Sequence, residues 1–304
     1  MRQTYRFTVE SEFEGERIDK FLSFQLPEVS RSALQRLIRE GEVIVDQRNE
    51  KANFRVSKGN VIHITIPDAI DSEIYPENIP LDILYEDEDL LIVNKPKDMV
   101  VHPSAGHMEG TLVNAVMYHS KDSLSGINGQ IRPGIVHRID KDTTGSLIIC
   151  KNDEAHIDIA KQIKDHTVKR IYRGIVLGHV KEDEGTITSD IGRHNNDRKK
   201  MAVVSKNGKT ATTHFRIIEH LKNATYMEFE LETGRTHQIR VHMASIGHPL
   251  LGDTVYGPKT NPYHLTGQTL HAQTIGFVHP KQKQYMEFSA PLPAYFLDLL
   301  TKLR

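Results

Sequence analysis

The sequence has little that would tie the chain to a membrane or to an oxidising compartment. Only one cysteine occurs among 304 residues, so no internal disulfide can form, and we expect a cytoplasmic location. No apolar run reaches the roughly 18 residues that a membrane-spanning helix needs, and the N-terminus lacks the apolar core of a signal peptide. The cysteine, Cys150, lies within an apolar run and is therefore expected to be a buried packing residue.

An excess of one charge is also lacking, because 39 basic and 40 acidic residues give a net charge of -1. The distribution is nevertheless uneven, since six cations and a single aspartate fall between residues 193 and 209. These cations are Arg193, Arg198, Lys199, Lys200, Lys206 and Lys209. A local basic face is enough to hold a phosphate backbone, so we expect Arg193, Lys199 and Lys200 to form a face that can bind nucleic acid. The alternative is a solvated hairpin rich in lysine.

Prolines divide the chain into two expected domains. Pro67, Pro76 and Pro80 fall in an acidic, apolar-poor stretch that is typical of a linker. We therefore place the domains at 1–76 and 77–304. Hydrophobic residues make up 38% of the chain and charged residues 26%, as expected for a globular protein with a sizeable core.

The first domain is predicted to contain two short helices followed by a small hairpin. Apolar residues at helical spacing predict one helix over 18–26 and a second between Ser30, its N-cap, and Gly41, which ends it. Apolar runs at 43–45 and 61–64 predict two strands joined by a turn.

The second of these helices carries three arginines on one side. Arg31, Arg36 and Arg39 fall within about 140° of one another at 100° per residue, opposite the apolar stripe. Two helices and a hairpin with such arginines resemble the alpha-L RNA-binding domain first known from a small-subunit ribosomal protein. The resemblance implies that the arginines follow phosphates rather than read bases. The alternative is an ordinary solvated helix face.

The second domain is predicted to contain more strands than helices. The predicted helices are 111–118, 153–164, 236–246 and 294–303. The predicted strands are 90–93, 147–150, 171–176, 186–191, 213–218, 226–231, 269–278 and 286–288. Because strands and helices do not alternate regularly, we expect an α+β fold with a mixed, largely antiparallel sheet rather than a doubly wound fold.

The segment from His137 to Gly145 concentrates reactive side chains. It holds a basic pair, two carboxylates, two hydroxyls and a glycine directly before the apolar run 147–150. A polar loop that leads into a buried strand commonly holds a reactive side chain rigidly at a cleft. Alone, the segment is compatible with a kinase-type catalytic loop, a metal pair of Asp140 and Asp142, or a structural turn.

Most of these alternatives lack the residues that they require. A protein kinase needs a glycine-rich loop and a downstream Asp-Phe-Gly, and the chain has neither. No His-Glu-x-x-His and no Cys/His cluster occurs, and Ser146 lacks the Gly-x-Ser-x-Gly frame of a serine hydrolase. Asp140 and Asp142 have no third ligand at a fixed spacing. We therefore expect no metal site.

Two further segments combine with this loop. Residues 169–176 are predicted to form a strand that carries Tyr172 among basic side chains. The second segment follows a glycine turn and runs into a helix that is expected to begin with Arg235 and Thr236 near its positive end. Arg240 would lie one turn after Thr236, on the same side of that helix.

Together these segments resemble the signature motifs of the ribosomal large-subunit pseudouridine synthases, RluA class, RluD-like branch. The matching motifs are His137-Arg138-Ile139-Asp140 with Thr143-Thr144-Gly145, the Tyr172 strand, Asn94-Lys95-Pro96 through Val101-His102-Pro103, Gly234-Arg235-Thr236-His237-Gln238-Ile239-Arg240-Val241-His242, and Gly247-His248-Pro249-Leu250 with Gly252-Asp253-Thr254-Val255-Tyr256-Gly257. The resemblance covers nearly the whole chain. It implies isomerisation of uridine to pseudouridine in RNA, with no cofactor, metal or energy source.

The resemblance also implies roles for three catalytic residues. Asp140 is then the nucleophile, and carboxylates form covalent glycosyl intermediates elsewhere. Whether it attacks the sugar or the base, or removes a ribose proton, stays open. Arg240 would keep Asp140 ionised, and the alternative is a structural ion pair. Tyr172 would stack on the uracil, and its hydroxyl would take the proton from the carbon-linked product.

Other residues of the motifs have less definite roles. Arg138 matches the arginine that is inserted in place of the flipped base, although a phosphate or structural contact is the alternative. Arg235 would hold either a phosphate or the backbone of its own motif. His137 is expected to be structural. Asp98 stands where the family usually has glycine, and aspartate tolerates a left-handed turn better than most residues.

Three functions compete for this sequence. The favoured one is an RNA-modifying isomerase, working as a monomer with large-subunit ribosomal RNA as its expected partner. The others are a non-catalytic RNA-binding or ribosome-assembly factor and a metal-dependent sugar transferase that uses Asp140 and Asp142. The joint presence of Asp140, Tyr172 and Arg240 favours the isomerase, because a binding module does not need all three. Which uridines are modified does not follow from the sequence.

Overall fold

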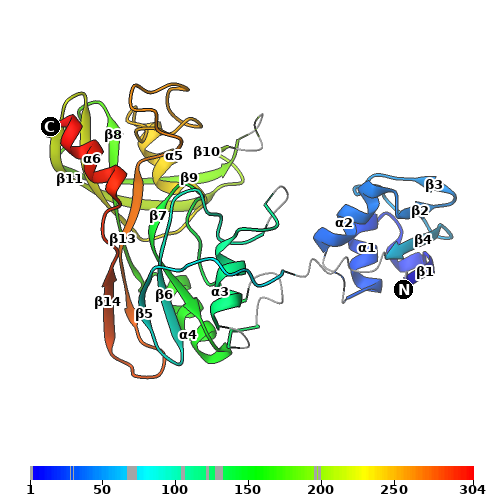
Figure 1. Ribbon diagram of the computed structural model, residues 1–304. Coiled ribbons are helices and arrows are strands. Elements are labelled where there is room, and N and C mark those ends of the chain that lie inside the picture. The colour runs from blue at the N-terminus through cyan, green and yellow to red at the C-terminus, as the bar shows by residue number, and fades with distance from the viewer. Residues whose placement is uncertain are drawn as a thin grey trace. The chain divides into compact units, whose positions relative to one another are not determined.

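The chain forms two compact units, Met1–Ser72 and Glu73–Arg304, in the computed structural model (Figure 1). The structure describes residues 3–27, 29, 31–66, 74–103, 107–120, 123–126, 133–194, 197 and 200–304. Ser30, Pro67, Arg198 and Lys199, for which the sequence suggested roles, lie outside these ranges. Within them, no helix is both long enough and apolar enough to cross a membrane.

The first unit combines two helices with a small antiparallel sheet. Its elements are β1 (Gln3–Thr8), the 3-10 helix η1 (Ser11–Phe13), α1 (Ile18–Gln25), α2 (Arg31–Glu40), β2 (Val43–Val45), β3 (Arg48–Asn49) and β4 (Val61–Ile66). The strand order is β1-β4-β2-β3, with every described pair antiparallel. The predicted helices and the strands β2 and β4 are present, whereas β1, η1 and β3 are additional.

One apolar cluster holds this unit together. Phe21 of α1, Leu34 of α2 and Ile62 of β4 are buried within it. The second helix is followed by Gly41 with φ +81°, the left-handed conformation that ends many helices and that glycine adopts without steric cost. The amphipathic spacing that predicted the two helices therefore reflects a real shared core.

The second unit is built on one large sheet. Its strands are β5 (Ile83–Glu86), β6 (Leu90–Lys95), β7 (Thr144–Cys150), β8 (Lys169–Leu177), β9 (Glu184–Arg193), β10 (Met201–Val203), β11 (Lys209–Leu221), β12 (Ala224–Leu231), β13 (Leu270–Val278) and β14 (Tyr285–Ser289). Its helices are α3 (Leu112–Ser120), α4 (Asp153–Lys164), α5 (Gln238–Ser245) and α6 (Ala294–Leu303). The described strands run in the order β10-β9-β11-β12-β8-β13-β7-β6-β5, with β14 paired to β13.

The sheet is mixed and largely antiparallel, which confirms the expected fold class. Its described parallel pairing joins β13 to β7 through only two residue pairs, His271 with Thr144 and Ala272 with Gly145. The other described strand pairs of this unit are antiparallel. The β7 strand, which follows the reactive segment, thus enters the middle of the sheet next to β13.

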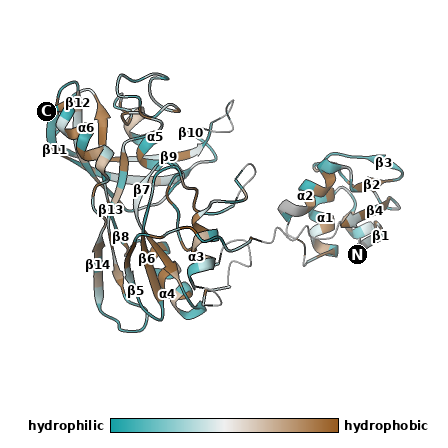
Figure 2. Ribbon diagram, viewed as in Figure 1, coloured by the Kyte–Doolittle hydropathy of each residue, from teal (hydrophilic) through white to brown (hydrophobic). Residues whose placement is uncertain are grey.

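Both faces of β6 are buried, which explains its unbroken apolar sequence. Leu91 and Val93 belong to the cluster that includes α3, whereas Leu90 and Ile92 belong to the cluster that includes α4. Apolar residues colour this part of the sheet brown in Figure 2. Cys150 of β7 is fully buried in the second cluster, and burial raises the pKa of its thiol, in agreement with the expected packing role.

One wrongly predicted helix boundary affects the site. The helix expected over 236–246 begins at Gln238, because His237 has φ +58° and ψ +22°, a left-handed conformation that cannot continue a right-handed helix. Arg235 and Thr236 therefore lie in the turn before α5. Arg240 does not share a helix face with Thr236.

Candidate active site

The reactive segment is fixed to β13 at its C-terminal end. The side chain of Gln268 donates to Thr143 Oγ1 at 3.0 Å, and Thr144 Oγ1 lies 2.7 Å from His271 Nδ1. Gly145 has φ +111°, and a Cβ at this position would overlap the backbone carbonyl of Ala272. Only glycine permits this close approach, so the strand holds the preceding loop at a defined place.

Asp140 is held by a buried arginine. Arg240 of α5 donates from Nη1 to Asp140 Oδ2 at 2.9 Å, although the two residues are separated by 100 positions in the chain. The same guanidinium donates from Nε and Nη2 to the carboxylate of Asp253 at 2.7 and 3.0 Å. Burial alone would lower the pKa of Arg240, but the two carboxylates outweigh it and raise that pKa. The arginine is therefore a permanent cation beside Asp140.

Asp253 orients this arginine and was not assigned a role from the sequence. Its Oδ1 also accepts hydrogen bonds from the backbone N–H groups of Val255 and Tyr256, at 2.9 and 3.1 Å. The aspartate belongs to a stretch that resembled the family, but nothing in that stretch indicated a contact with Arg240. Its side chain is completely buried.

Tyr172 lies in the same cleft as Asp140 and Arg240. The cleft has a volume of about 480 Å³, and its lining also includes Arg138, Arg235 and His237. Burial raises the pKa of Tyr172 to about 12, although Arg170 opposes the shift. The hydroxyl therefore keeps its proton at neutral pH.

The cleft is rich in positive charge. Arg170 is buried and donates from Nη2 to the carbonyl oxygens of Leu231 and Glu232, at 3.3 and 2.7 Å. Arg138 is exposed at the cleft. Arg235 donates from Nε to the carbonyl oxygen of Thr210 at 3.0 Å, so its observed contact is with backbone. Several arginines around one carboxylate suit a polyanionic ligand.

His137 has a structural contact, in line with its expected role. Its Nε2 accepts a hydrogen bond from the Ile148 N–H at 2.9 Å, which requires an unprotonated nitrogen. Although the residue as a whole is only half-buried, burial of the ring, with Arg170 nearby, lowers the pKa of His137 to about 3. The neutral imidazole joins the loop to β7.

A buried lysine ties the reactive loop to the segment after β6. The ammonium of Lys95 donates to the carbonyl oxygens of Pro96, Met99 and Lys141, at 2.7, 2.8 and 2.9 Å. Asp98, in the same segment, has φ +65°, which confirms the expected left-handed turn. Its carboxylate pairs with Lys141 Nζ at 2.9 Å.

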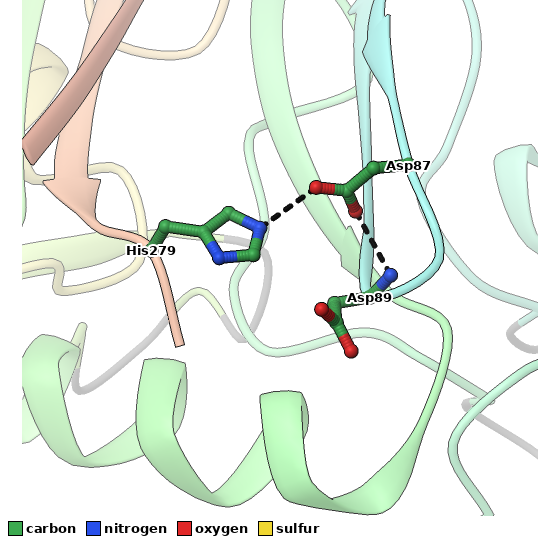
Figure 3. A group of neighbouring side chains, drawn as sticks. All are labelled: Asp87, Asp89 and His279. Atoms are coloured by element: carbon green, nitrogen blue, oxygen red, sulfur yellow. Dashed lines mark hydrogen bonds and ion pairs between the residues drawn. The ribbon is translucent and has the colours of Figure 1, made fainter. Parts of the chain in front are cut away.

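The described residues include one group with the spacing of a metal site, and it lies outside this cleft. Figure 3 shows the group, Asp87, Asp89 and His279. His279 Nδ1 accepts the backbone N–H groups of Lys281 and Gln282, at 3.2 and 3.1 Å. The ring proton must then be on Nε2, which lies 2.8 Å from Asp87 Oδ2 and donates to it. Because no ring lone pair is left for an ion, the group is a structural link between two turns.

The three arginines of α2 that were predicted to bind RNA differ in their surroundings. Arg31 pairs with Asp19, whose side chain is fully buried. Burial alone would raise the pKa of Asp19, but hydrogen bonds from Arg17, Arg31 and Gln35 lower it to about 2. Arg31 therefore has a structural contact.

Arg36 and Arg39 have weaker contacts in the same helix. Arg36 Nε lies 3.9 Å from Glu40 Oε2, and both side chains are well exposed. Arg39 donates from Nε to the carbonyl oxygen of Gln35 at 3.0 Å. Their charges remain accessible to a polyanion.

The basic stretch between β9 and β10 is only partly described. Arg193 is exposed at the end of β9, and Lys200 is half-buried just before β10. The His194 N–H donates to the Lys200 carbonyl oxygen at 3.0 Å, which closes the hairpin. Neither residue contributes to the lining of the cleft.

The arginine-held aspartate and the arginine-rich cleft suit an enzyme that acts on a polyanionic substrate. Residues 89–245 match the family model for RNA pseudouridylate synthases, and residues 16–62 match that of the S4 domain. The chain belongs to the RNA pseudouridylate synthase family, and its first unit contains an S4 domain.

Relatives and solved structures are similar over most of the chain. The uncharacterized RNA pseudouridine synthase YlyB of Bacillus subtilis (strain 168) is 48% identical over 98% of this chain and 97% of its own length. A protein of Zymomonas mobilis, named ribosomal large subunit pseudouridine synthase D, is 45% identical over 95% of this chain and 94% of its own. The structure of human RNA pseudouridylate synthase domain containing 1 aligns with a TM-score of 0.58 and 26% identity, covering 71% of this chain and 84% of that chain.

Proposed function

We propose that this enzyme converts uridines of large-subunit ribosomal RNA into pseudouridine. Relatives named ribosomal large subunit pseudouridine synthase D support this substrate, at 45% identity in Zymomonas mobilis and 41% in Pseudomonas aeruginosa. Both alignments cover at least 95% of this chain. The relatives thus match the S4 domain together with the catalytic unit.

Asp140 is the nucleophile in this proposal. The observation that carries it is the 2.9 Å contact between Arg240 Nη1 and Asp140 Oδ2, in a cleft where the Asp140 side chain keeps 17% of its surface exposed. The paired guanidinium fixes the orientation of the carboxylate, and the remaining exposure leaves an oxygen accessible to a nucleotide. An ionised, accessible carboxylate is what nucleophilic catalysis requires.

The reaction redistributes bonds within one nucleotide. The bond from the ribose C1′ to the uracil N1 breaks, the uracil turns, and a bond from C1′ to C5 forms. The proton on C5 leaves, and N1 gains a proton. Because no electrons are gained or lost overall, the proposed reaction needs no redox cofactor.

The target base must leave the RNA stack to reach Asp140. Flipping costs a few kcal/mol, which a side chain inserted in the vacated space can offset. Arg138 is exposed at the cleft, two residues before Asp140, and its planar guanidinium can stack on neighbouring bases. We assign Arg138 this inserted position.

Tritium release tests the substrate and the chemistry together. RNA labelled with tritium at C5 of uridine loses the label only when the new carbon–carbon bond forms. We expect release from large-subunit ribosomal RNA, with small-subunit ribosomal RNA and transfer RNA as matched controls, and we expect it to persist in EDTA. No release from large-subunit RNA would contradict the proposal, and a requirement for added Mg²⁺ would favour the sugar-transferase alternative.

A further inference from the structure

His237 lies between the proposed nucleophile and a tyrosine from another part of the chain. Its Nε2 is 3.9 Å from Asp140 Oδ1, the carboxylate oxygen that Arg240 does not contact. Its Nδ1 is 2.8 Å from the hydroxyl of Tyr256, and the two rings are nearly perpendicular, at 81°. The side chain of His237 is 19% exposed.

The contacts of Tyr256 determine which nitrogen of His237 carries the proton. The tyrosine oxygen accepts the backbone N–H of Met201, the first residue of β10, at 2.8 Å. This leaves the hydroxyl proton free to donate to His237 Nδ1, an arrangement in which Nδ1 is the unprotonated nitrogen. The Nε2–H consequently faces Asp140. The opposite tautomer would direct a lone pair at a carboxylate.

The electrostatic surroundings favour a neutral imidazole. Burial lowers the pKa of His237, and the cations Arg240 and Arg138 lower it further. Asp140 and Asp253 raise it but do not reverse the shift. At neutral pH the ring is therefore a neutral donor rather than a second cation.

The left-handed backbone of His237 aims this side chain. With φ +58°, the residue stands immediately before α5 and outside its helical geometry. Strained backbone positions of this kind often occur at functional sites. The family motif includes His237, but no pattern in the sequence connects it with Asp140 or Tyr256.

We propose that His237 is a positioning residue for Asp140. Its Nε2–H orients Oδ1 while Arg240 orients Oδ2, so that the carboxylate is held from both sides. The 3.9 Å separation shortens when RNA occupies the cleft, as catalytic hydrogen bonds often do. Tyr256 sets the tautomer of His237 and, through its hydrogen bond with Met201, connects His237 to the start of β10. This role rests on the proposed isomerase function.

Two substitutions at the same position separate positioning from a purely structural role. H237Q keeps an amide N–H donor near the position of the imidazole Nε2. The side chain of H237N is too short to place a donor there, but asparagine tolerates a left-handed backbone better than glutamine does. We expect H237N to lower kcat at least about tenfold with little change in KM, and H237Q to lower it less than about threefold. A structural role alone predicts the reverse order, and that order would overturn the proposal.

Imidazole ¹⁵N shifts test the tautomer independently of activity. We expect the Nε2–H tautomer of His237 at neutral pH in the wild-type chain, and loss of this preference in Y256F. That variant keeps the ring, which lies 5.1 Å from Arg240 Cζ. An Nδ1–H tautomer in the wild type would overturn the proposal.

The outcomes also distinguish the two proposals from each other. Absence of tritium release from the wild type would refute the isomerase function, and the positioning role with it. The reversed order of the two His237 variants would refute the positioning role alone.

Discussion

Arg240 lies between two carboxylates of unequal exposure. The side chain of Asp253 is 0% exposed and takes two of the guanidinium nitrogens, whereas Asp140 takes the third and is 17% exposed. Asp253 thereby fixes the plane of the guanidinium. A buried ion pair contributes little net stability, but it holds its members in one geometry. At the residue scale, this group is better suited to orienting Asp140 than to stabilising the fold.

Tyr172→Phe tests the proposed hydroxyl chemistry. The ring packing is kept, so we expect unchanged RNA affinity and a rate lowered by about 10²–10⁴ if the hydroxyl takes part in proton transfer. Because the pKa of Tyr172 is about 12, a base role requires RNA binding to lower that pKa. Single-turnover rates of the variant measure this effect. Tyr226→Phe, at another buried tyrosine outside the cleft lining, is the matched control, and wild-type rates in both variants would exclude the role.

Sequence motifs indicated Asp140, Tyr172 and Arg240, and the structure places all three in one cleft. The roles of Asp253 and His237 could not be predicted, because no residue spacing in the sequence indicates the contact of Asp253 with Arg240 or the approach of His237 to Asp140. A left-handed residue at a helix start also leaves no periodic pattern that a sequence could reveal.

At the scale of elements, the junction of β7 with β13 determines where the reactive loop lies. Gly145→Ala would force a Cβ against the Ala272 backbone, and we expect it to destabilise the second unit by about 3 kcal/mol or more. Gly247→Ala is the matched control. Gly247 also has positive φ, at +88°, but nothing lies within 4 Å of the added Cβ, so a loss of about 1–2 kcal/mol is expected. Equal losses in chemical denaturation would contradict this account.

The β9–β10 hairpin is expected to hold RNA by charge. Replacing Arg193 and Lys200 by glutamine should weaken binding and reduce the salt dependence of log K by about 0.7–0.9 for each RNA phosphate that is no longer neutralised. Binding titrations at several salt concentrations measure this slope. Lys302→Gln, an exposed cation of α6, is the control. An unchanged slope in the double variant would remove the hairpin from the RNA interface.

Several elements with a clear apolar pattern were predicted, whereas three strands without one were not. The unbroken apolar run of β6 and the spacing of α4 and α6 reflect burial, and these elements lie where they were expected. The strands β3 and β10 have two and three residues, and β5 is half exposed, so none of the three has a clear alternation. These strands are defined by backbone pairing with β9, β2 and β6, which the sequence does not reveal.

At the scale of the whole molecule, a net charge of -1 does not exclude local groups of exposed cations, such as Arg36 and Arg39 of α2. Arg36→Gln with Arg39→Gln should lower RNA affinity, seen as a higher KM, while leaving the single-turnover rate at saturating RNA unchanged. The first unit would thus contribute binding and the second unit chemistry. A lowered saturating rate with unchanged KM would contradict this division.

Arg31 provides a contrast within the same helix. Because its guanidinium pairs with the buried carboxylate of Asp19, Arg31→Gln is expected to destabilise the first unit, whereas the Arg36 and Arg39 changes are not. Thermal unfolding of the full chain distinguishes the two sets. The sequence placed all three on one stripe, and the structure adds that Arg31, although exposed, also pairs with a buried carboxylate.

The central claim is that Asp140 performs the isomerisation, and one measurement tests it most directly. Large-subunit ribosomal RNA is incubated with the wild-type protein or with Asp140→Asn, and pseudouridine is mapped chemically. The account predicts discrete pseudouridines with the wild type. It predicts none with the variant, which should still fold and bind the RNA. Pseudouridine formation by Asp140→Asn at the wild-type rate would contradict it.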